Sequence, residues 1–148
     1  MEIILFQPQI PQNTGNIVRT SSVTGSSLTL VKPLGFSTSA RMLKRAGLDY
    51  WDGVNVKEID DLFAYLEKSS SPFYFFSSHS TRPYTDVSYT PDDLLIFGSE
   101  TAGLPALYRE KWPERFLTIP MRKNNRCLNL ANAVSVVVYE AWRQNQFA

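Results

Sequence analysis

Two short runs of apolar residues constrain the fold of this chain more than any other feature. They are Phe73–Phe76, with the sequence FYFF, and Leu94–Phe97, with the sequence LLIF. A strand with one face in water alternates apolar and polar residues, whereas an uninterrupted apolar run of strand length is typical of a strand buried on both faces. Helices must then cover both faces of the sheet. The two runs therefore predict an α/β fold whose sheet is mostly parallel and flanked by helices.

The rest of the chain fits strands that alternate with helices. Apolar runs, with the Pro and Gly residues that end them, predict further strands at residues 2–7, 28–31, 54–56 and 116–119. Capping and periodicity predict helices at residues 17–23, 40–46, 61–68 and 129–144. Asn16 would cap the first of these helices and Gly25 would end it. With no linker and no internal repeat, we expect residues 1–148 to form a single α/β domain.

The composition is that of an ordinary globular protein and argues against several kinds of site. The single cysteine, Cys127, rules out an internal disulfide framework, and one cysteine with one histidine is a poor basis for a zinc site, so no metal is expected. No apolar run is long enough to span a bilayer, and the N-terminus lacks the basic segment and apolar core of a secretion signal. We expect a cytoplasmic protein that has no membrane partner.

The basic residues are clustered although the net charge is only +1. They form two groups, the second without an intervening acid: Arg41, Lys44 and Arg45, and Arg115, Arg122, Lys123 and Arg126. Such patches can bind phosphates while the rest of the surface stays neutral. Solvated helix and loop surfaces would show the same pattern, so charge alone does not assign an RNA-binding role.

Residues 13–19, with the sequence NTGNIVR, follow the first predicted strand. Turns at the carboxyl ends of parallel strands are where ligands bind in α/β sheets. We predict such a turn around Gly15, with Arg19 in the first turn of the helix that follows. A helix dipole disfavours a cation there, so an arginine in this place suggests a task such as gripping a phosphate or polarising a hydroxyl. The alternative is a capped loop with a surface arginine.

Two later segments carry polar residues at comparable places. In residues 97–104, FGSETAGL, two glycines flank Glu100 and allow the backbone to approach a ligand closely. Residues 119–133 contain IPM, a basic stretch and then CLNLANA, in which Asn129 and Asn132 share one face at the start of the last helix. A glycine-rich turn and ordinary helix capping would explain each segment taken alone.

Motifs of three large enzyme classes are absent from the sequence. It contains no G-x-G-x-x-G fingerprint, no G-x-x-x-x-G-K-[ST] loop and no G-x-S-x-G elbow. A Rossmann dinucleotide enzyme, a P-loop NTPase and an α/β-hydrolase therefore lose their main support.

The three segments, in this order and at this spacing, resemble the motifs of the SPOUT methyltransferase superfamily and are most similar to its TrmH-type branch of RNA ribose methyltransferases. The matching sequences are NTGNIVR, FGSETAGL, and IPM followed by RCLNLANAVS. Further segments, KPLGF from Lys32, RAGLDYW from Arg45 and VSVVVYEAWRQ from Val134, are similar to small single-domain members of that branch. The resemblance extends from about residue 3 to about residue 144.

The resemblance implies a fold, a reaction and a substrate. The fold would be an α/β domain whose C-terminal part forms a deep trefoil knot. The reaction would transfer a methyl group from S-adenosyl-L-methionine to a ribose 2'-oxygen and leave S-adenosyl-L-homocysteine. The acceptor would be the wobble nucleotide in the anticodon stem-loop of tRNA, a cytidine or a modified uridine. The enzyme would be a homodimer joined through the knot region and the C-terminal helix.

The resemblance also assigns residues to the site. The donor would be held, mostly through backbone groups, by Phe76, Gly98, Ile119, Cys127 and Leu128. The catalytic residues would be Asn13, Arg19, Glu100 and Asn129. Glu100 would lie near the positive centre of the donor, while the two asparagines hold Arg19 and the loops in place. Because a guanidinium is very hard to deprotonate, we interpret Arg19 as a group that positions an RNA phosphate and stabilises the developing alkoxide, not as a base.

One residue departs from the family pattern, since the family usually has serine where this chain has Cys127. A thiol is a weaker hydrogen-bond donor than a hydroxyl. Activity should fall if this side chain assists catalysis and change little if only its backbone is used. His79 is interpreted as a loop residue, with a place in the donor pocket as the alternative. Two other functions stay open: methylation of another RNA such as ribosomal RNA, and RNA binding without catalysis by a protein that retains the fold.

Overall fold

Six parallel strands form one sheet in the computed structural model, which describes residues 1–39 and 53–148. The strand order is β3-β2-β1-β5-β4-β6. The strands are β1 Glu2–Phe6, β2 Ser27–Val31, β3 Val56–Ile59, β4 Phe73–Phe76, β5 Leu94–Phe97 and β6 Phe116–Leu117. The α-helices are α1 Pro11–Thr24, α3 Leu62–Lys68, α4 Ala106–Lys111 and α5 Leu130–Gln144, and short 3-10 helices span Tyr84–Asp86 and Pro113–Arg115.

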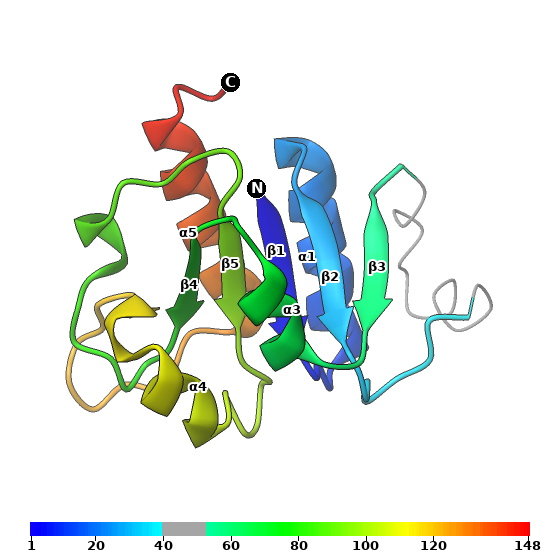
Figure 1. The fold of residues 1–148 in the computed structure, drawn as a ribbon, viewed down its shortest axis with the longest axis horizontal. Helices are drawn as coiled ribbons and strands as arrows, with labels where there is room; N and C mark the ends of the chain where they lie inside the picture. The colour runs from blue at the N-terminus through cyan, green and yellow to red at the C-terminus, as the bar shows by residue number, and fades with distance from the viewer. Residues whose placement is uncertain (40–52) are drawn as a thin grey trace.

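Helices cover both faces of this sheet, as the uninterrupted apolar runs predicted. Helices α1 and α5 pack against each other on one face, and α3 and α4 lie on the other (Figure 1). Within β1, Ile3 and Leu5 join the core that includes residues of α1 and α5, whereas Ile4 joins the core that includes residues of α3 and α4. In β4 and β5, too, alternate side chains belong to the two cores on opposite faces of the sheet. The prediction of a parallel α/β sheet flanked by helices is confirmed.

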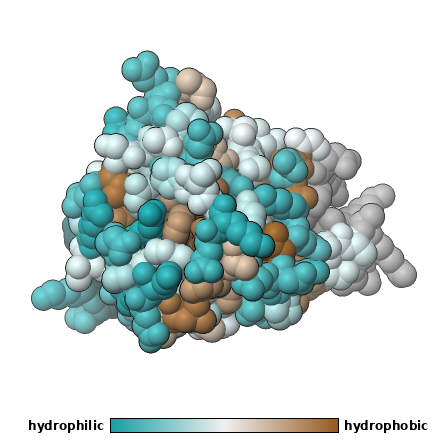
Figure 2. Space-filling model, viewed as in Figure 1, coloured by the Kyte–Doolittle hydropathy of each residue, from teal (hydrophilic) through white to brown (hydrophobic). Residues whose placement is uncertain are grey.

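The core beneath α3 and α4 contains a cluster of aromatic rings among aliphatic side chains. Phe75 is fully buried, and its ring stacks on that of Phe116 with 4.6 Å between the centroids. The rings of Tyr108 and Trp112 lie 5.6 and 6.1 Å from it. Burial of Tyr108 raises the pKa of its hydroxyl to about 12. The outer surface of this side of the molecule is largely hydrophilic, with small and separate hydrophobic patches (Figure 2).

The helix that follows β1 differs most from the sequence prediction. It begins at Pro11 rather than at residue 17, and residues 13–16 are helical rather than a turn. Ile10 occupies the N-cap position without a side-chain cap of its own, so the local capping signal at Asn16 was misleading. The end of the helix is as predicted, because Gly25 follows it in a left-handed conformation with φ of 69°.

The other helices and strands lie close to their predicted places. Helix α3 is capped by Asp61, whose side chain accepts a hydrogen bond from the backbone N–H of Ala64 at 3.0 Å. Strand β3 begins at Val56 instead of residue 54, and β6 is shorter than predicted. Helix α4 was not predicted. The helix predicted at residues 40–46 lies outside the described residues.

The strand order locates a site before any side chain is considered. Strand β1 is followed outward by β2 and β3 on one side and by β5, β4 and β6 on the other, so the order reverses between β1 and β5. Ligands of open parallel sheets bind beyond the carboxyl ends of the strands at such a reversal. The segments that follow Phe6 and Phe97 are the segments at that position.

Replacement of Phe75 by alanine is expected to lower the free energy of unfolding by about 3–5 kcal/mol, because it leaves a cavity among four aromatic rings. The measurement is urea unfolding followed by far-UV circular dichroism. Phe147→Ala is the matched control, since Phe147 is 55% exposed, and it should cost about 1 kcal/mol or less. A smaller loss for Phe75→Ala than for the control would contradict the central role of this ring.

Candidate active site

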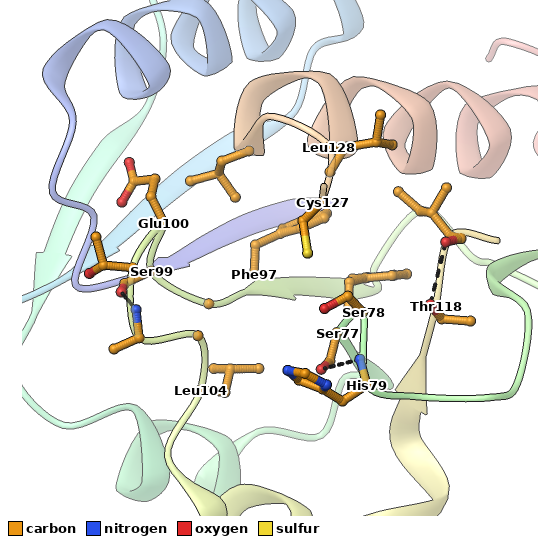
Figure 3. A pocket seen from close by; sticks show the side chains of 18 of the residues that line it. Ser77, Ser78, His79, Phe97, Ser99, Glu100, Leu104, Thr118, Cys127 and Leu128 are labelled. Carbon is orange, nitrogen blue, oxygen red and sulfur yellow. Dashed lines mark hydrogen bonds between the residues drawn. The ribbon is translucent and has the colours of Figure 1, made fainter. Parts of the chain in front are cut away.

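A cavity of about 540 Å³ opens beyond the carboxyl ends of β4, β5 and β6. Its walls come from the segments that follow these strands and from the start of α1 and of α5 (Figure 3). The volume lies within the range of small-molecule sites. All the predicted site residues except Arg19 line it: Asn13, Phe76, Gly98, Glu100, Ile119, Cys127, Leu128 and Asn129. The three motifs, far apart in the sequence, therefore meet around one cavity.

Part of the cavity wall is apolar. The rings of Phe76 and Phe97, at the ends of neighbouring strands, are stacked with 4.8 Å between centroids and an angle of 17° between planes. Leu104, Ile119 and Leu128 add aliphatic surface. A wall of this kind offers contact to an apolar group, while the surrounding backbone offers hydrogen bonds at defined positions.

Gly98 closes the loop that follows β5. A Cβ atom at this position would lie 2.5 Å from the carbonyl carbon of Gly103, so no other residue fits without a shift of the backbone. The two ends of the loop are joined by hydrogen bonds between Ser99 and Gly103 at 3.2 and 3.1 Å, and Gly103 has a φ of +63°. Both glycines are needed to fold the 97–104 segment into a tight loop, which presents Glu100 to its neighbours.

The carboxylate of Glu100 binds backbone N–H groups at the start of helix α1, although Glu100 is far from this helix in the sequence. It accepts hydrogen bonds from the backbone N–H groups of Gln9 at 2.8 Å and Ile10 at 3.1 Å. A third comes from Nδ2 of Asn13 at 3.2 Å. The N-terminus of a helix carries unpaired N–H groups and the positive end of the helix dipole, both of which favour a negative charge. Glu100 therefore binds the backbone N–H groups at and just before the N-cap position, where Ile10 offers no side-chain acceptor.

Asn13 and Asn129 continue this chain of hydrogen bonds to the last helix. Oδ1 of Asn13 accepts from Nδ2 of Asn129 at 2.9 Å, and Oδ1 of Asn129 accepts from the backbone N–H groups of Ala131 and Asn132 at the start of α5. The orientation of both amides follows from chemistry, because a carboxylate only accepts and a backbone N–H only donates. One relay thus joins the loop after β5, the start of α1 and the start of α5.

Arg19 lies outside the set of described residues that line the cavity. It is exposed in the third turn of α1, not in the first turn as predicted. With a rise of about 1.5 Å per residue, it lies roughly 9 Å along the helix from Asn13. The argument from the helix dipole therefore does not apply to it, and its catalytic role stays a prediction.

The segment between β6 and α5 forms another side of the cavity. Cys127 and Leu128 are exposed there, and Sγ of Cys127 points into the cavity (Figure 3). Arg122, Lys123 and Arg126 are exposed just before them. The second basic cluster is smaller than the sequence indicated, because Arg115 is held over the ring of Phe73, with Cζ 4.2 Å from the centroid.

The sequence prediction missed part of the lining. Ser77, Ser78 and His79 follow β4 and border the cavity, so the alternative interpretation of His79 is the one that the structure supports (Figure 3). Arg109 reaches the cavity from α4. A signal for this helix was present, since Pro105 precedes the strongly helix-forming sequence ALYREK.

Neither a metal site nor a membrane span emerges from the described part of the chain. No three His, Cys, Asp or Glu residues in it are grouped so that they could bind a metal ion. No helix in it has the length and apolar character needed to cross a bilayer.

Comparison with known proteins gives matches over nearly the whole chain. The model of the SpoU rRNA Methylase family matches residues 1–139. A tRNA (cytidine(34)-2'-O)-methyltransferase from Yersinia pestis is 46% identical over 97% of this chain and 93% of its own length. A structure from work on the 2-OH methylation of C/U34 on tRNA is 40% identical, with a TM-score of 0.89 over 99% of this chain and 97% of that one.

A more distant structure shares the fold. It is the SpoU methyltransferase AviRb from Streptomyces viridochromogenes in complex with the cofactor AdoMet. It is 22% identical, with a TM-score of 0.84 over 99% of this chain and 58% of that one. The arrangement of strands and helices therefore persists where most of the sequence has changed.

Removal of either asparagine of the relay is expected to destabilise the protein. Asn13→Ala and Asn129→Ala should each lower the free energy of unfolding by about 1–3 kcal/mol, because each leaves part-buried polar groups without a partner. The double variant should cost less than the sum of the two, since both changes break the same chain of hydrogen bonds. Urea unfolding of the four proteins gives the three values.

Asn132→Ala is the matched control, because Asn132 is exposed in the first turn of the same helix. It should change the free energy of unfolding by about 0.5 kcal/mol or less. Strictly additive losses at Asn13 and Asn129 would show that the two residues do not act as one relay.

Proposed function

The chain belongs to the SpoU rRNA Methylase family, and we propose that it transfers a methyl group from S-adenosyl-L-methionine to the ribose 2'-oxygen of nucleotide 34 of tRNA, a cytidine or uridine. The observation that carries this proposal is the relay from Glu100 through Asn13 to Asn129, which brings three separate motifs to one cavity. The acceptor is named by relatives that are 40–46% identical over nearly the whole chain.

The cavity suits the donor. Its apolar wall, which includes Phe76 and Phe97, offers contact to a base. The tight loop at Gly98 fixes the position of the backbone beside that wall. Backbone groups of Gly98, Ile119, Cys127 and Leu128 would hold the donor together with that wall. When bound, S-adenosyl-L-methionine supplies an electrophilic methyl group on a sulfonium. No metal ion is needed for this reaction.

Glu100 acts chiefly as a positioning residue. Its carboxylate accepts three hydrogen bonds from neutral donors and so holds the start of α1 against the loop. A carboxylate also favours a positive ligand group nearby. Asn13 lies at the start of α1 and Asn129 at the start of α5, and the hydrogen bond between them joins these two helix starts.

Arg19 acts on the acceptor rather than on the donor. It is exposed on α1, outside the cavity lining, where it can reach a phosphate of bound RNA. A guanidinium in that place holds the ribose in position and stabilises negative charge on its 2'-oxygen during transfer. The exposed cations Arg122, Lys123 and Arg126 would add phosphate contacts beside the cavity.

We also propose the knot and the dimer of the family. The connection from β6 to α5 borders the cavity together with the loops that follow β4 and β5, as expected if the C-terminal segment passes through a knot there. A dimer would cover apolar residues exposed on α1 and α5: Val23, Val136 and Tyr139. It would also bring the basic residues of one subunit beside the cavity of the other, and the anticodon stem-loop of tRNA would bind across both.

Ribosomal RNA is the second candidate acceptor, because the description of the matching family names it. A single experiment separates the candidates. The protein is incubated with labelled S-adenosyl-L-methionine and either unmodified tRNA or ribosomal RNA, and the labelled nucleotide is mapped. We expect label at the 2'-oxygen of nucleotide 34 of tRNA. Label in ribosomal RNA alone would replace the tRNA acceptor, and donor binding without transfer to any RNA would favour a non-catalytic protein.

Arg19→Ala is expected to abolish methyl transfer in this assay and to leave the affinity for S-adenosyl-L-methionine within about twofold, because Arg19 lies outside the cavity. The measurements are labelled transfer and calorimetric titration of the donor. Lys68→Ala is the control: this exposed cation ends α3, on the face of the sheet opposite α1, and should leave both values unchanged. Loss of donor binding in Arg19→Ala would refute the assignment of Arg19 to the acceptor.

Cys127 gives a test of the donor site that does not depend on catalysis. It is the single cysteine of the chain, it is exposed, and its Sγ points into the cavity (Figure 3). We expect S-adenosyl-L-homocysteine at saturation to slow alkylation of Cys127 by iodoacetamide by about tenfold or more, because the open thiol becomes covered. Mass spectrometry follows the reaction, with adenosine monophosphate as the control ligand. Equal rates with and without S-adenosyl-L-homocysteine would place the donor elsewhere.

A further inference from the structure

The charged lining of the cavity consists chiefly of two side chains of opposite sign. Among the described residues that border it, Glu100 is the acidic residue and Arg109 is the arginine, and His79 is the remaining residue of an ionisable basic type. The exposed cations of the 122–126 stretch do not contribute to the lining. A cavity with so few charges imposes an orientation on any ligand that carries charges of its own.

Arg109 is held in place by two contacts. Its Cζ lies 4.3 Å from the centroid of the Phe116 ring, and its Nη2 donates a hydrogen bond to Oγ of Ser80 at 3.0 Å. The residue is half-buried, and it forms no ion pair with an acid of residues 1–39 or 53–148. Only one of its five N–H donors is used by Ser80, so an oriented guanidinium keeps donors for a ligand.

The two charges lie toward opposite ends of the cavity. Glu100 contacts Gln9 and Ile10, which follow β1, whereas Arg109 contacts Ser80 and Phe116, which belong to the side of β4 and β6. Strand β5 separates β1 from β4 in the sheet. The cavity is therefore negative toward α1 and positive toward β6, with the apolar wall of Phe76 and Phe97 between the ends.

We propose that Arg109 binds the α-carboxylate of the methionine part of the donor. The proposal rests on the proposed function, because it takes S-adenosyl-L-methionine as the ligand. That molecule is a zwitterion with a carboxylate at one end and a sulfonium a few bonds away. A planar guanidinium pairs with a carboxylate through two parallel N–H···O bonds, and the partly enclosed setting strengthens such a pair. Arg109 thereby directs the sulfonium toward the end of the cavity that contains Glu100.

The test compares two ligands that differ only in this carboxylate, S-adenosyl-L-methionine and its decarboxylated form. Calorimetric titration gives both dissociation constants for the wild-type protein and for Arg109→Gln. We expect the wild type to prefer the intact donor by about ten- to hundredfold, which is the usual effect of a charge-assisted hydrogen bond. Arg109→Gln should bind the two ligands within about threefold of each other, with an unchanged affinity for the decarboxylated form.

Arg115→Gln is the matched control, since Arg115 lies over a phenylalanine ring at nearly the same distance but outside the cavity lining. It should keep the wild-type preference. Equal binding of the two ligands by the wild type would overturn the proposal even if Arg109→Gln failed to fold. So would a preference that survives in Arg109→Gln, which would leave Arg109 to an RNA phosphate. Failure of the wild type to bind either ligand would instead remove the proposed function.

Discussion

The rest of the site depends on the hydrogen bonds that the carboxylate of Glu100 accepts at the start of α1. This carboxylate is the point where the loop after β5 meets the helix after β1, at the place where the strand order reverses. Without it, α1 would begin with an isoleucine at the N-cap and with N–H groups that have no local acceptor. Through Asn13 and Asn129 the same interaction fixes the start of α5. Three segments are thus positioned by a single relay of polar groups.

The tight loop that presents Glu100 explains why this relay needs its particular neighbours. Gly98 must lack a side chain because the backbone of Gly103 passes at contact distance, and Gly103 must adopt a positive φ. A larger residue at either place would move the carboxylate away from α1, and an acid at a helix N-terminus acts only over the first turn. The cavity wall and the helix cap are therefore parts of one local structure, so substitutions that alter one are expected to alter the other.

Most of the fold and most of the segments that line the cavity could be predicted from the sequence. The hydrogen bonds that hold these segments together could not. Uninterrupted apolar runs such as Phe73–Phe76 report burial on both faces, and this local signal was sufficient for the parallel sheet. The start of α1 was missed because its cap comes from Glu100, about ninety residues away, and no local pattern reveals such a partner. The family resemblance assigned Asn13 and Asn129 to one site, yet their mutual hydrogen bond became evident only in the structure.

The arginines show why the number of charges in the sequence did not reveal the cation that borders the cavity. Arg115 and Arg109 each lie over a phenylalanine ring at nearly the same distance, 4.2 and 4.3 Å. Arg115 also donates to the backbone oxygen of Phe73 and serves the packing of the sheet, whereas Arg109 borders the cavity. The difference arises from α4, which turns Arg109 toward the loop after β4. A net charge of +1 is therefore compatible with recognition of charged ligands, because a few cations held in fixed orientations act where the ligand binds.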